Sequence, residues 1–257
     1  MLAAARGLDA TLHHVDHALR DGSQREADRV AALASRLSAR FVSHTVVVAP
    51  GGNLEARARE ARRGVLPEGA LTGHTMDDQA ETVLLNLLRG AGLDGLAGMA
   101  TATKPMLSLR REEVRAFVAA SGVEVVVDPS NFDLSLRRNL VRARVLPELS
   151  AVAGRDLVPV LARQAGLARD DAACLDAAAL DAVPDAHDVA ALRAAPVALR
   201  RRRLRALVRG TGRSAGASSA AELERVEAVV QGAAVAAELA GGRRVARRQG
   251  RLTVDEP

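Results

Sequence analysis

Short β-branched runs alternate with amphipathic runs over the first half of the chain. ATLHHVDH (10–17) and RFVSHTVVV (40–48) have the length and the β-branched content of strands. Between them, SQREADRVAALASRLS (23–38) repeats apolar residues at helical spacing behind a serine cap. The order strand, helix, strand predicts one βαβ unit with two parallel strands.

The same alternation continues beyond this unit. We predict a helix from Asn53 through NLEARAREARRGV, a short strand before Gly73, and a helix MDDQAETVLLNLLRG that stops at Gly90. After GAGLDGLAGM follow a helix REEVRAFVAASG, a strand EVVVD (124–128), a DPSN turn and a basic helix LSLRRNLVRARVLPEL (134–149). The pattern indicates an α/β domain with a Rossmann-like parallel sheet covered by helices.

The second half of the chain has a different pattern. It is helical almost without interruption from Arg155 to about Gln231, and the tail AAVAAELAGGRRVARRQGRLTVDE then resembles short strands joined through Gly241 and Gly242. We therefore predict two domains. Residues 1–150 form the parallel-sheet nucleotide-binding domain, and residues 151–257 form a smaller, mostly helical domain with a β tail.

Composition adds an unusual charge pattern. The chain has no Trp or Tyr, so its core must be built from Ala, Val and Leu. Of 36 basic residues only Lys104 is a lysine. This bias toward arginine indicates first the codon usage of a GC-rich genome and only second a functional choice. The net charge of +5 and the isoelectric point near 10.8 favour an anionic partner where the charge is clustered.

Cysteine count and hydropathy exclude several protein classes. The single Cys174 cannot form an internal disulfide or a CxxC metal site, and its Ala-rich surroundings predict a buried structural thiol. No stretch approaches the ~18 apolar residues of a membrane span, and Arg6 and Asp9 interrupt the apolar start before it could be a signal peptide. We expect a soluble, cytoplasmic protein without a membrane partner.

The segment GHTMDDQAETVLLNLLRGAGLDGLAGM (73–99) is the most specific in the chain. Thr75 and Asp78 have the spacing of a helix-capping pair, and Asp77 and Glu81 are one helical turn apart. Acids in a first turn each stabilise a helix by about 0.3–1 kcal/mol, which alone could explain them. Their place after a predicted strand end and His74, where ligands collect in parallel-sheet proteins, favours an active site.

Five motifs together resemble a known family. HVDHALR (14–20), NLEARAREAR (53–62), GHTMDDQAET, RGAGLDGLAGM, and DPSN with RRNLVRARVLPEL resemble, in order and spacing, successive motifs of the tRNA(Ile)-lysidine synthetase family of PP-loop ATP pyrophosphatases. The resemblance covers nearly the whole chain. It implies that ATP adenylates the wobble cytidine of the CAU-anticodon isoleucine tRNA and that free lysine then displaces AMP.

The resemblance also implies roles for individual residues. Carboxylates bind Mg²⁺ through oxygen and can hold an ammonium group. Asp77, Asp78 and Glu81 are thus expected to be catalytic, with Asp77 and Asp78 the ligands of Mg²⁺ or of the lysine ammonium. The nucleotide is expected near His14, Asp16, His74 and Arg89, although a histidine in such a strand is commonly a core residue.

Arginines suggest where RNA binds. No acid lies between Asp188 and Glu222, and that window contains Arg193, Arg200, Arg201, Arg202, Arg203, Arg205, Arg209 and Arg213. One-sided charge is the footprint of phosphate contacts, while a solvated helix face remains the alternative. We expect Arg200, Arg201, Arg202, Arg203 and Arg205 to bind the anticodon arm, and Arg138 and Arg142, one turn apart, to clamp a phosphate or to pair with surface acids.

The chain departs from the family pattern at its start. Family members begin with a strand and an SGGxDS loop for the ATP phosphates, whereas this sequence opens with MLAAARGLDATLHHVDH. We therefore expect the chain as written to lack ATP-dependent activity, and codons upstream of Met1 to encode the loop. An RNA-binding remnant without catalysis is the alternative. A tRNA-thiolating relative is disfavoured, because its chemistry resembles a two-cysteine mechanism and this chain has one Cys. Whether the protein forms a homodimer stays open.

Overall fold

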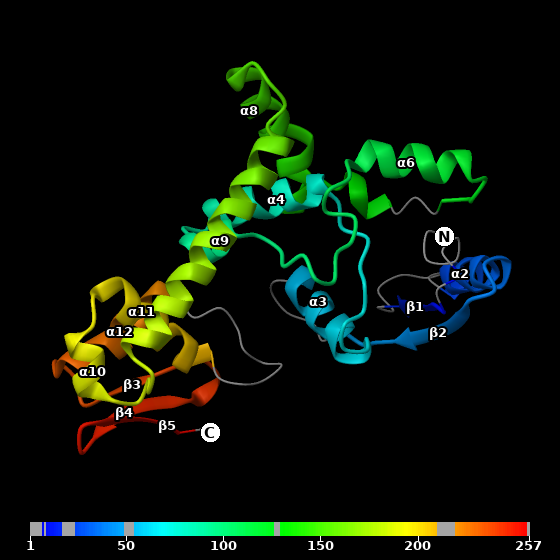
Figure 1. Cartoon of the computed structure of the whole chain (residues 1–257). Helices are drawn as coiled ribbons and strands as arrows, with labels where there is room; N and C mark the ends of the chain where they lie inside the picture. The colour runs from blue at the N-terminus through cyan, green and yellow to red at the C-terminus, as the bar shows by residue number, and fades with distance from the viewer. Residues whose placement is uncertain are drawn as a thin grey trace. The chain divides into compact units, whose positions relative to one another are not determined.

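The computed structural model describes residue 7 and residues 9–16, 24–48, 54–125, 129–209 and 219–255. The chain divides into two compact units (Figure 1). The first unit comprises Met1–Leu88 and Met99–Ala162, and the second comprises Arg89–Gly98 and Arg163–Pro257. The fold class is the one predicted, an α/β part followed by a mostly helical part with a β tail.

The first unit contains the predicted βαβ arrangement. Strands β1 (Thr11–Asp16) and β2 (Arg40–Thr45) are parallel, with Thr11 opposite Arg40 and Asp16 opposite Thr45. Helix α2 (Gln24–Arg36) joins them and contacts both strands. The part of the HVDHALR motif at 17–20 lies outside the described residues, as do Asn53 and the end of the predicted strand at 126–128.

The predicted strand before Gly73 is wrong. Residues 70–75 run between α3 (Leu54–Val65) and α4 (Met76–Leu87) without forming a strand. Their backbone meets the 101–109 segment through isolated hydrogen bonds, from Thr72 N to the Thr103 carbonyl at 2.9 Å and from Met76 N to the Leu109 carbonyl at 2.8 Å. Two bonds that far apart do not make a sheet ladder.

The remaining helices of this unit follow α4 in the chain. They are α6 (Arg111–Ala120), the 3₁₀ turn η1 (Pro129–Phe132), α7 (Arg137–Leu140), the π-helical segment η2 (Val141–Val145) and α8 (Leu146–Ala153). Residues 137–153 thus confirm the predicted basic helix, which passes through Pro147 and ends at Gly154 with a φ of 63°. Both α7 and η2 contact α4. Ala80 and Leu84 of α4 pack against Val141, Leu146 and Val158.

The second unit has the larger apolar core. It contains α5 (Leu93–Leu96), most of α9 (Val158–Ala182), α10 (Val189–Ala194), α11 (Val197–Arg209), α12 (Ala220–Gln231), η3 (Ala240–Gly242) and the predicted β tail. The tail is an antiparallel sheet in the order β3 (Ala236–Glu238), β4 (Arg244–Arg248), β5 (Arg251–Asp255). Leu192, Leu204, Val226, Val229, Val245 and Leu252 form the centre of this core.

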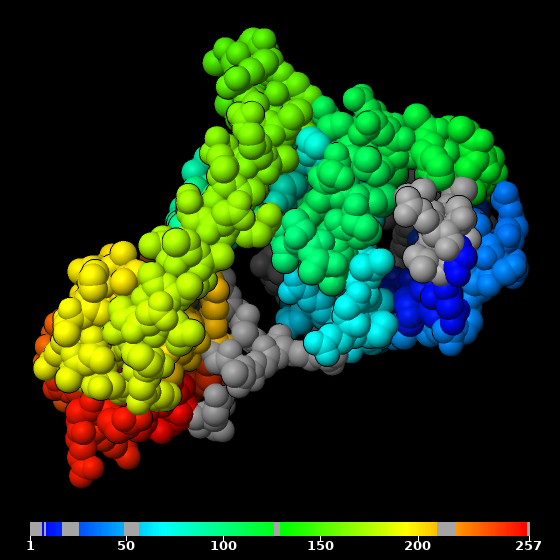
Figure 2. Space-filling model, in the orientation of Figure 1, coloured from blue at the N-terminus to red at the C-terminus, as the bar shows by residue number. Residues whose placement is uncertain are grey.

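The expectation of a buried Cys174 is wrong. The thiol is exposed on α9, whose surface is visible in yellow-green in Figure 2. Ala165, Ala172 and Ala179 define the buried face of that helix, and Cys174 lies about 200° around the helix from Ala172. No helix among the described residues combines the length and the apolar character that a membrane span requires.

Candidate active site

Helix α4 presents the three acids of the most specific motif. Thr75 is its N-cap, and one oxygen of Asp78 accepts hydrogen bonds from the Thr75 N–H and from the Thr75 hydroxyl, both at 2.8 Å. The predicted capping pair is therefore confirmed. It fixes Asp77 and Asp78 in the first turn of the helix, and Glu81 one turn further along.

Asp77 is held by the start of α6. Its carboxylate accepts the Arg111 backbone N–H at 2.7 Å and two guanidinium nitrogens of Arg110 at 3.3 Å. Arg110 also pairs with Asp156, which precedes α9. The side chain of Asp77 is 14% exposed, so solvent reaches it only in part.

A single guanidinium joins Asp78 and Glu81. Arg111 Nη2 donates to Asp78 Oδ1 at 2.9 Å and to Glu81 Oε1 at 2.7 Å. Spacing alone indicated that Asp77 and Glu81 would act as a pair on one face. The fold instead places Asp78 and Glu81, three positions apart, on the same arginine.

Glu81 is fully buried and meets further arginines. Arg142 Nε donates to Glu81 Oε1 at 2.7 Å and Arg142 Nη2 donates to Oε2 at 3.1 Å. Arg138 Nε lies 3.9 Å from Glu81 Oε2, and Arg138 Nη2 donates to the Thr82 hydroxyl at 3.2 Å. Arg142 projects from the π-helical segment, a local geometry that is frequent at functional sites. Both arginines face acids of α4.

Asp77 and Asp78 are ionised at neutral pH. Burial by itself would raise the pKa of Asp78, but the bonds from Thr75 and the charge of Arg111 outweigh it and hold the pKa below its ordinary value. The pKa of Asp77 is lowered in the same way, against burial, by the Arg111 N–H and by Arg110. Burial would lower the pKa of Arg111, yet Glu81 and Asp78 raise it. Arg110 and Arg111 therefore act as the counter-charges of Asp77 and Asp78.

His74 lies beside this cluster. Its Nδ1 is 2.8 Å from the Thr72 hydroxyl. Burial lowers the pKa of His74, and Lys104 adds to this effect while Asp78 opposes it. The imidazole is therefore neutral at pH 7.

His14 and Asp16 lie toward the carboxyl end of β1, opposite Ser43 and Thr45. His14 Nε2 is buried and has no hydrogen-bond partner among the described residues. Arg89, the fourth residue expected near the nucleotide, is exposed and belongs to the second compact unit. The structure thus brings His74, but not Arg89, into the unit that contains the acids.

A wide cleft adjoins the acid cluster. Its volume is about 1010 Å³, and Arg111 and Arg142, which hold Glu81, line it together with Arg115 and Phe132. Val114, Val118, Ala119, Val125, Asn131, Leu134, Asn139 and Ala143 complete the lining. A largely apolar cleft with a few convergent polar groups is the usual form of a small-molecule site.

Sequence reasoning missed Arg110 and Arg111. Both stand at the start of α6, where positive charge opposes the helix dipole. Basic residues at that unfavourable position are the signal that could have revealed partners elsewhere in the fold.

The acids do not fit a magnesium site. Both oxygens of Asp77 accept from Arg110 or Arg111, and those of Asp78 accept from Thr75 and Arg111. Within the described ranges, no three His, Cys, Asp or Glu side chains gather closely enough to hold a metal ion. A hard cation that needs several oxygen ligands would have to displace guanidiniums first.

The expected RNA-binding arginines of α11 meet acids from elsewhere in the second unit. Arg200 and Arg201 pair with Glu227 of α12 at 2.8 and 2.7 Å. Arg203 donates to the carbonyls of Val183 and Pro184 at 2.7 and 2.9 Å. Residues 189–221 contain no acid in the sequence, but acids from other parts of the chain lie beside these arginines in the fold.

The partners of Arg202 and Arg205 complete this pattern. Arg202 pairs with Asp94 at 3.1 Å and with Asp176, and Arg205 pairs with Asp94 at 2.9 Å. Arg200 and Arg202 are only 7% and 8% exposed. Two of the five expected arginines are therefore buried, and Arg213 lies outside the described residues.

Comparison with known proteins agrees with this architecture. Residues 1–149 match the family model of a PP-loop domain, and residues 188–253 match that of the TilS substrate binding domain. A tRNA(Ile)-lysidine synthase of Salinispora tropica is 43% identical over 100% of the chain and 85% of its own length. Proteins of the same name from Thermobifida fusca and Streptomyces coelicolor are 40% and 38% identical, covering 98% and 92% of the chain and 85% and 74% of their own lengths.

Proposed function

Because the chain belongs to the tRNA(Ile)-lysidine synthase family, we propose that it ligates lysine to the wobble cytidine of the CAU-anticodon isoleucine tRNA at the expense of ATP. The observation that supports this most is the extent of the match, which takes in the whole chain and both domains. The proposal places the reaction in the cytoplasm.

The reaction has two steps. The cytidine O2 attacks the α-phosphorus of ATP, a C–O–P link forms, and pyrophosphate leaves. An amino group of lysine then attacks the activated ring carbon, the carbon–oxygen bond breaks, AMP leaves, and the attacking nitrogen loses a proton. Lysine arrives as an ammonium and must release one proton before its neutral amine attacks the electrophilic carbon. The site must therefore bind a cation, let that proton leave and keep water from the activated carbon.

Asp77 and Asp78 are the groups that we assign to the lysine ammonium. Their side chains are 14% and 16% exposed, whereas Glu81 is completely buried. An ammonium that replaces one guanidinium exchanges one single positive charge for another, so the charge balance of the cluster is unchanged. Glu81 then acts as a positioning residue that orients Arg111 and Arg142.

The proposal includes ATP as a cofactor but does not use magnesium at the acids of α4. ATP use is supported by the PP-loop domain match, and His14, Asp16 and His74, which lie in one compact unit, stay our candidates for its contacts. No step of the proposal uses Mg²⁺ at Asp77 and Asp78. A cation that needs several oxygen ligands would displace several donors of Arg110, Arg111 and Thr75, whereas an ammonium takes the place of one guanidinium.

The cleft beside Arg111 and Arg142 is the place that we assign to the target nucleotide. Phe132 lines it and is 73% exposed, so the face of its ring is accessible to a base that enters the cleft. In a chain without Trp or Tyr, a phenylalanine is the natural surface for stacking a base, and such stacking contributes about 1–3 kcal/mol.

Replacing Phe132 tests this assignment. Phe132→Ala should lower kcat/KM for tRNA about tenfold, since a lost stacking contact weakens binding of the base. Phe117→Ala is the matched control, because Phe117 is 47% exposed on α6 and is absent from the cleft lining. Equal effects of the two substitutions on kcat/KM would contradict the assignment of the cleft to the target nucleotide.

The function itself is tested by lysine transfer. Under this proposal, purified protein, ATP, labelled lysine and a CAU-anticodon tRNA transcript should give labelled tRNA with release of pyrophosphate, and a transcript with uridine at the wobble position should give neither. The same assay decides against the proposal if the chain is inactive, as the opening of its sequence leads us to expect. Binding of tRNA without pyrophosphate release would instead favour an RNA-binding protein without catalysis. Sedimentation at the assay concentration decides whether the active species is a homodimer.

A further inference from the structure

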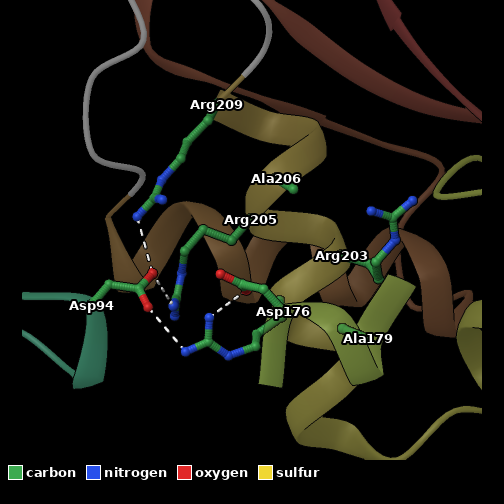
Figure 3. Close-up of a pocket in the computed structure, with 8 residues that line it drawn as sticks. Asp94, Asp176, Ala179, Arg203, Arg205, Ala206 and Arg209 are labelled. Carbon is green, nitrogen blue, oxygen red and sulfur yellow. Dashed lines mark hydrogen bonds and ion pairs between the residues drawn. The ribbon is translucent and has the colours of Figure 1, made fainter. Parts of the chain in front are cut away.

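One carboxylate in the second unit faces three arginines of a single helix. Asp94 accepts from Arg202 at 3.1 Å, from Arg205 at 2.9 Å and from Arg209 at 3.1 Å (Figure 3). These arginines project from successive turns of α11. Asp94 lies in the four-residue helix α5 of the glycine-rich segment, which belongs to the same compact unit.

The charges in this place do not cancel. Three guanidiniums meet Asp94 and Asp176, and Asp176 is 65% exposed, so water screens its charge. Arg203 also lines the space, but its side chain points away from Asp94 in Figure 3 and donates to the carbonyls of Val183 and Pro184. A net positive charge therefore stays beside Asp94.

The pKa of Asp94 agrees with that excess. Burial by itself would raise it, but the hydrogen bond and charge of Arg205, with the charges of Arg202 and Arg209, lower it below the ordinary value. Asp94 is therefore ionised at neutral pH. The positive charge of the three arginines exceeds the negative charge even when Asp94 is counted as an anion.

There is room for one more anion. The arginines surround a pocket of about 120 Å³ that Asp176, Ala179 and Ala206 also line. Since a water molecule takes about 30 Å³ in the liquid, this space accommodates a tetrahedral oxyanion or about four waters. Each guanidinium has five N–H donors in a fixed fork, and Arg209 is 42% exposed, so donors remain at the open side.

We infer that this pocket binds one phosphate group, and that in the working protein the group belongs to the RNA backbone. The second part rests on the proposed function. The pocket is thus a defined contact, in contrast to a diffuse basic surface: it has a fixed size, an internal counter-charge in Asp94, and donors from Arg202, Arg205 and Arg209.

The first experiment uses inorganic phosphate as the probe. Melting followed by circular dichroism in phosphate, and in chloride of equal ionic strength, should show a higher midpoint in phosphate, because a ligand of the folded state raises its stability. Arg209→Gln should abolish the difference, as should Ala206→Leu, which fills the pocket and changes no charge. Arg225→Gln is the control: Arg225 is exposed on α12, donates to the Glu238 carbonyl and does not line the pocket.

The second experiment uses an RNA hairpin with the anticodon-arm sequence. Arg209→Gln should weaken binding about tenfold and reduce the slope of log affinity against log salt by about 1. Ala206→Leu should weaken binding similarly, whereas general charge attraction predicts no effect of that substitution.

The outcomes separate the two claims. Equal melting midpoints of the unsubstituted protein in phosphate and chloride, or equal behaviour of Ala206→Leu and Arg225→Gln, would overturn the pocket. A phosphate effect without any loss of RNA affinity in the variants would overturn the assignment to the RNA backbone. Lysine transfer is scored on the unsubstituted protein, so its absence would reject the proposed function while the phosphate measurement still reports on the pocket.

Discussion

Glu81 is a buried acid on which the stability of the first unit depends. It is fully buried and accepts hydrogen bonds from Arg111 and Arg142. Glu81→Gln should lower the free energy of unfolding by about 3–5 kcal/mol, because it leaves guanidinium charge uncompensated in the interior. Chemical denaturation followed by circular dichroism measures this in a chain that has no Trp or Tyr to report by fluorescence.

Asp78→Asn provides the contrast for Glu81→Gln. The amide oxygen can still accept from the Thr75 N–H, so the loss of stability should stay near 1 kcal/mol. Lysine transfer should nevertheless fall at least tenfold, since the charge that we assign to the substrate ammonium is gone. Parallel losses of stability and activity would show that Asp78 serves only the helix cap.

Acid stability depends on the same carboxylates. The pKa values of Asp77 and Asp78 are lowered in the folded state, so their ionised forms stabilise the fold fully above the ordinary value of about 3.9. That stability is lost as pH falls from about 4 through the folded pKa values. The melting temperature should be flat from pH 7 to about 5 and then decline, and the decline should be shallower in Asp78→Asn.

Neighbouring arginines on helix α11 differ in role although they share one partner. Arg200 and Arg201 both pair with Glu227, yet their side chains are 8% and 50% exposed. Arg200→Ala should destabilise the fold by about 3–5 kcal/mol, because it leaves Glu227 only its exposed partner. Arg201→Ala should cost about 0–1 kcal/mol. Denaturant midpoints of the two variants, compared side by side, test the difference.

Similar effects of Arg200→Ala and Arg201→Ala on stability would mean that α11 does not use Arg200 as an anchor. The roles of Arg200 and Arg201 also decide which substitutions on α11 can test RNA binding. Removing Arg200 to Arg203 together would damage the α11–α12 packing as well as any phosphate contact, so substitutions at exposed positions are the informative ones.

Helices were predictable from sequence because their signals are local. Thr75 and Asp78 carry the cap of α4 within four positions, and α2, α3 and α6 follow apolar spacing. The failed strand before Gly73 needed a partner strand, which a local pattern cannot supply. Arg111 bridging Asp78 and Glu81 joins positions about 30 apart, so the composition of the acid cluster was predictable but its arginine partners were not.

At the scale of the whole molecule, stability should be uneven. The second unit contains the larger cluster of buried apolar residues, with Val226, Val229 and Val230 of α12 at 0% exposure. Amide hydrogen exchange should therefore be slowest in α12 and β4. It should be fast at 70–75, where the backbone makes isolated bonds. Slower exchange at 70–75 than in α12 would contradict this order.

The arginine clusters around Glu81 and Asp94 have a consequence at alkaline pH. Side chains that lose a proton between about pH 8 and 11 are cysteine, tyrosine and lysine, and this chain has one Cys, no Tyr and one Lys. Guanidinium does not deprotonate in proteins. The molecule therefore has almost no side-chain buffering capacity across that range: a titration with base should pass through it nearly without proton release, and both clusters should keep the charges that they have at neutrality.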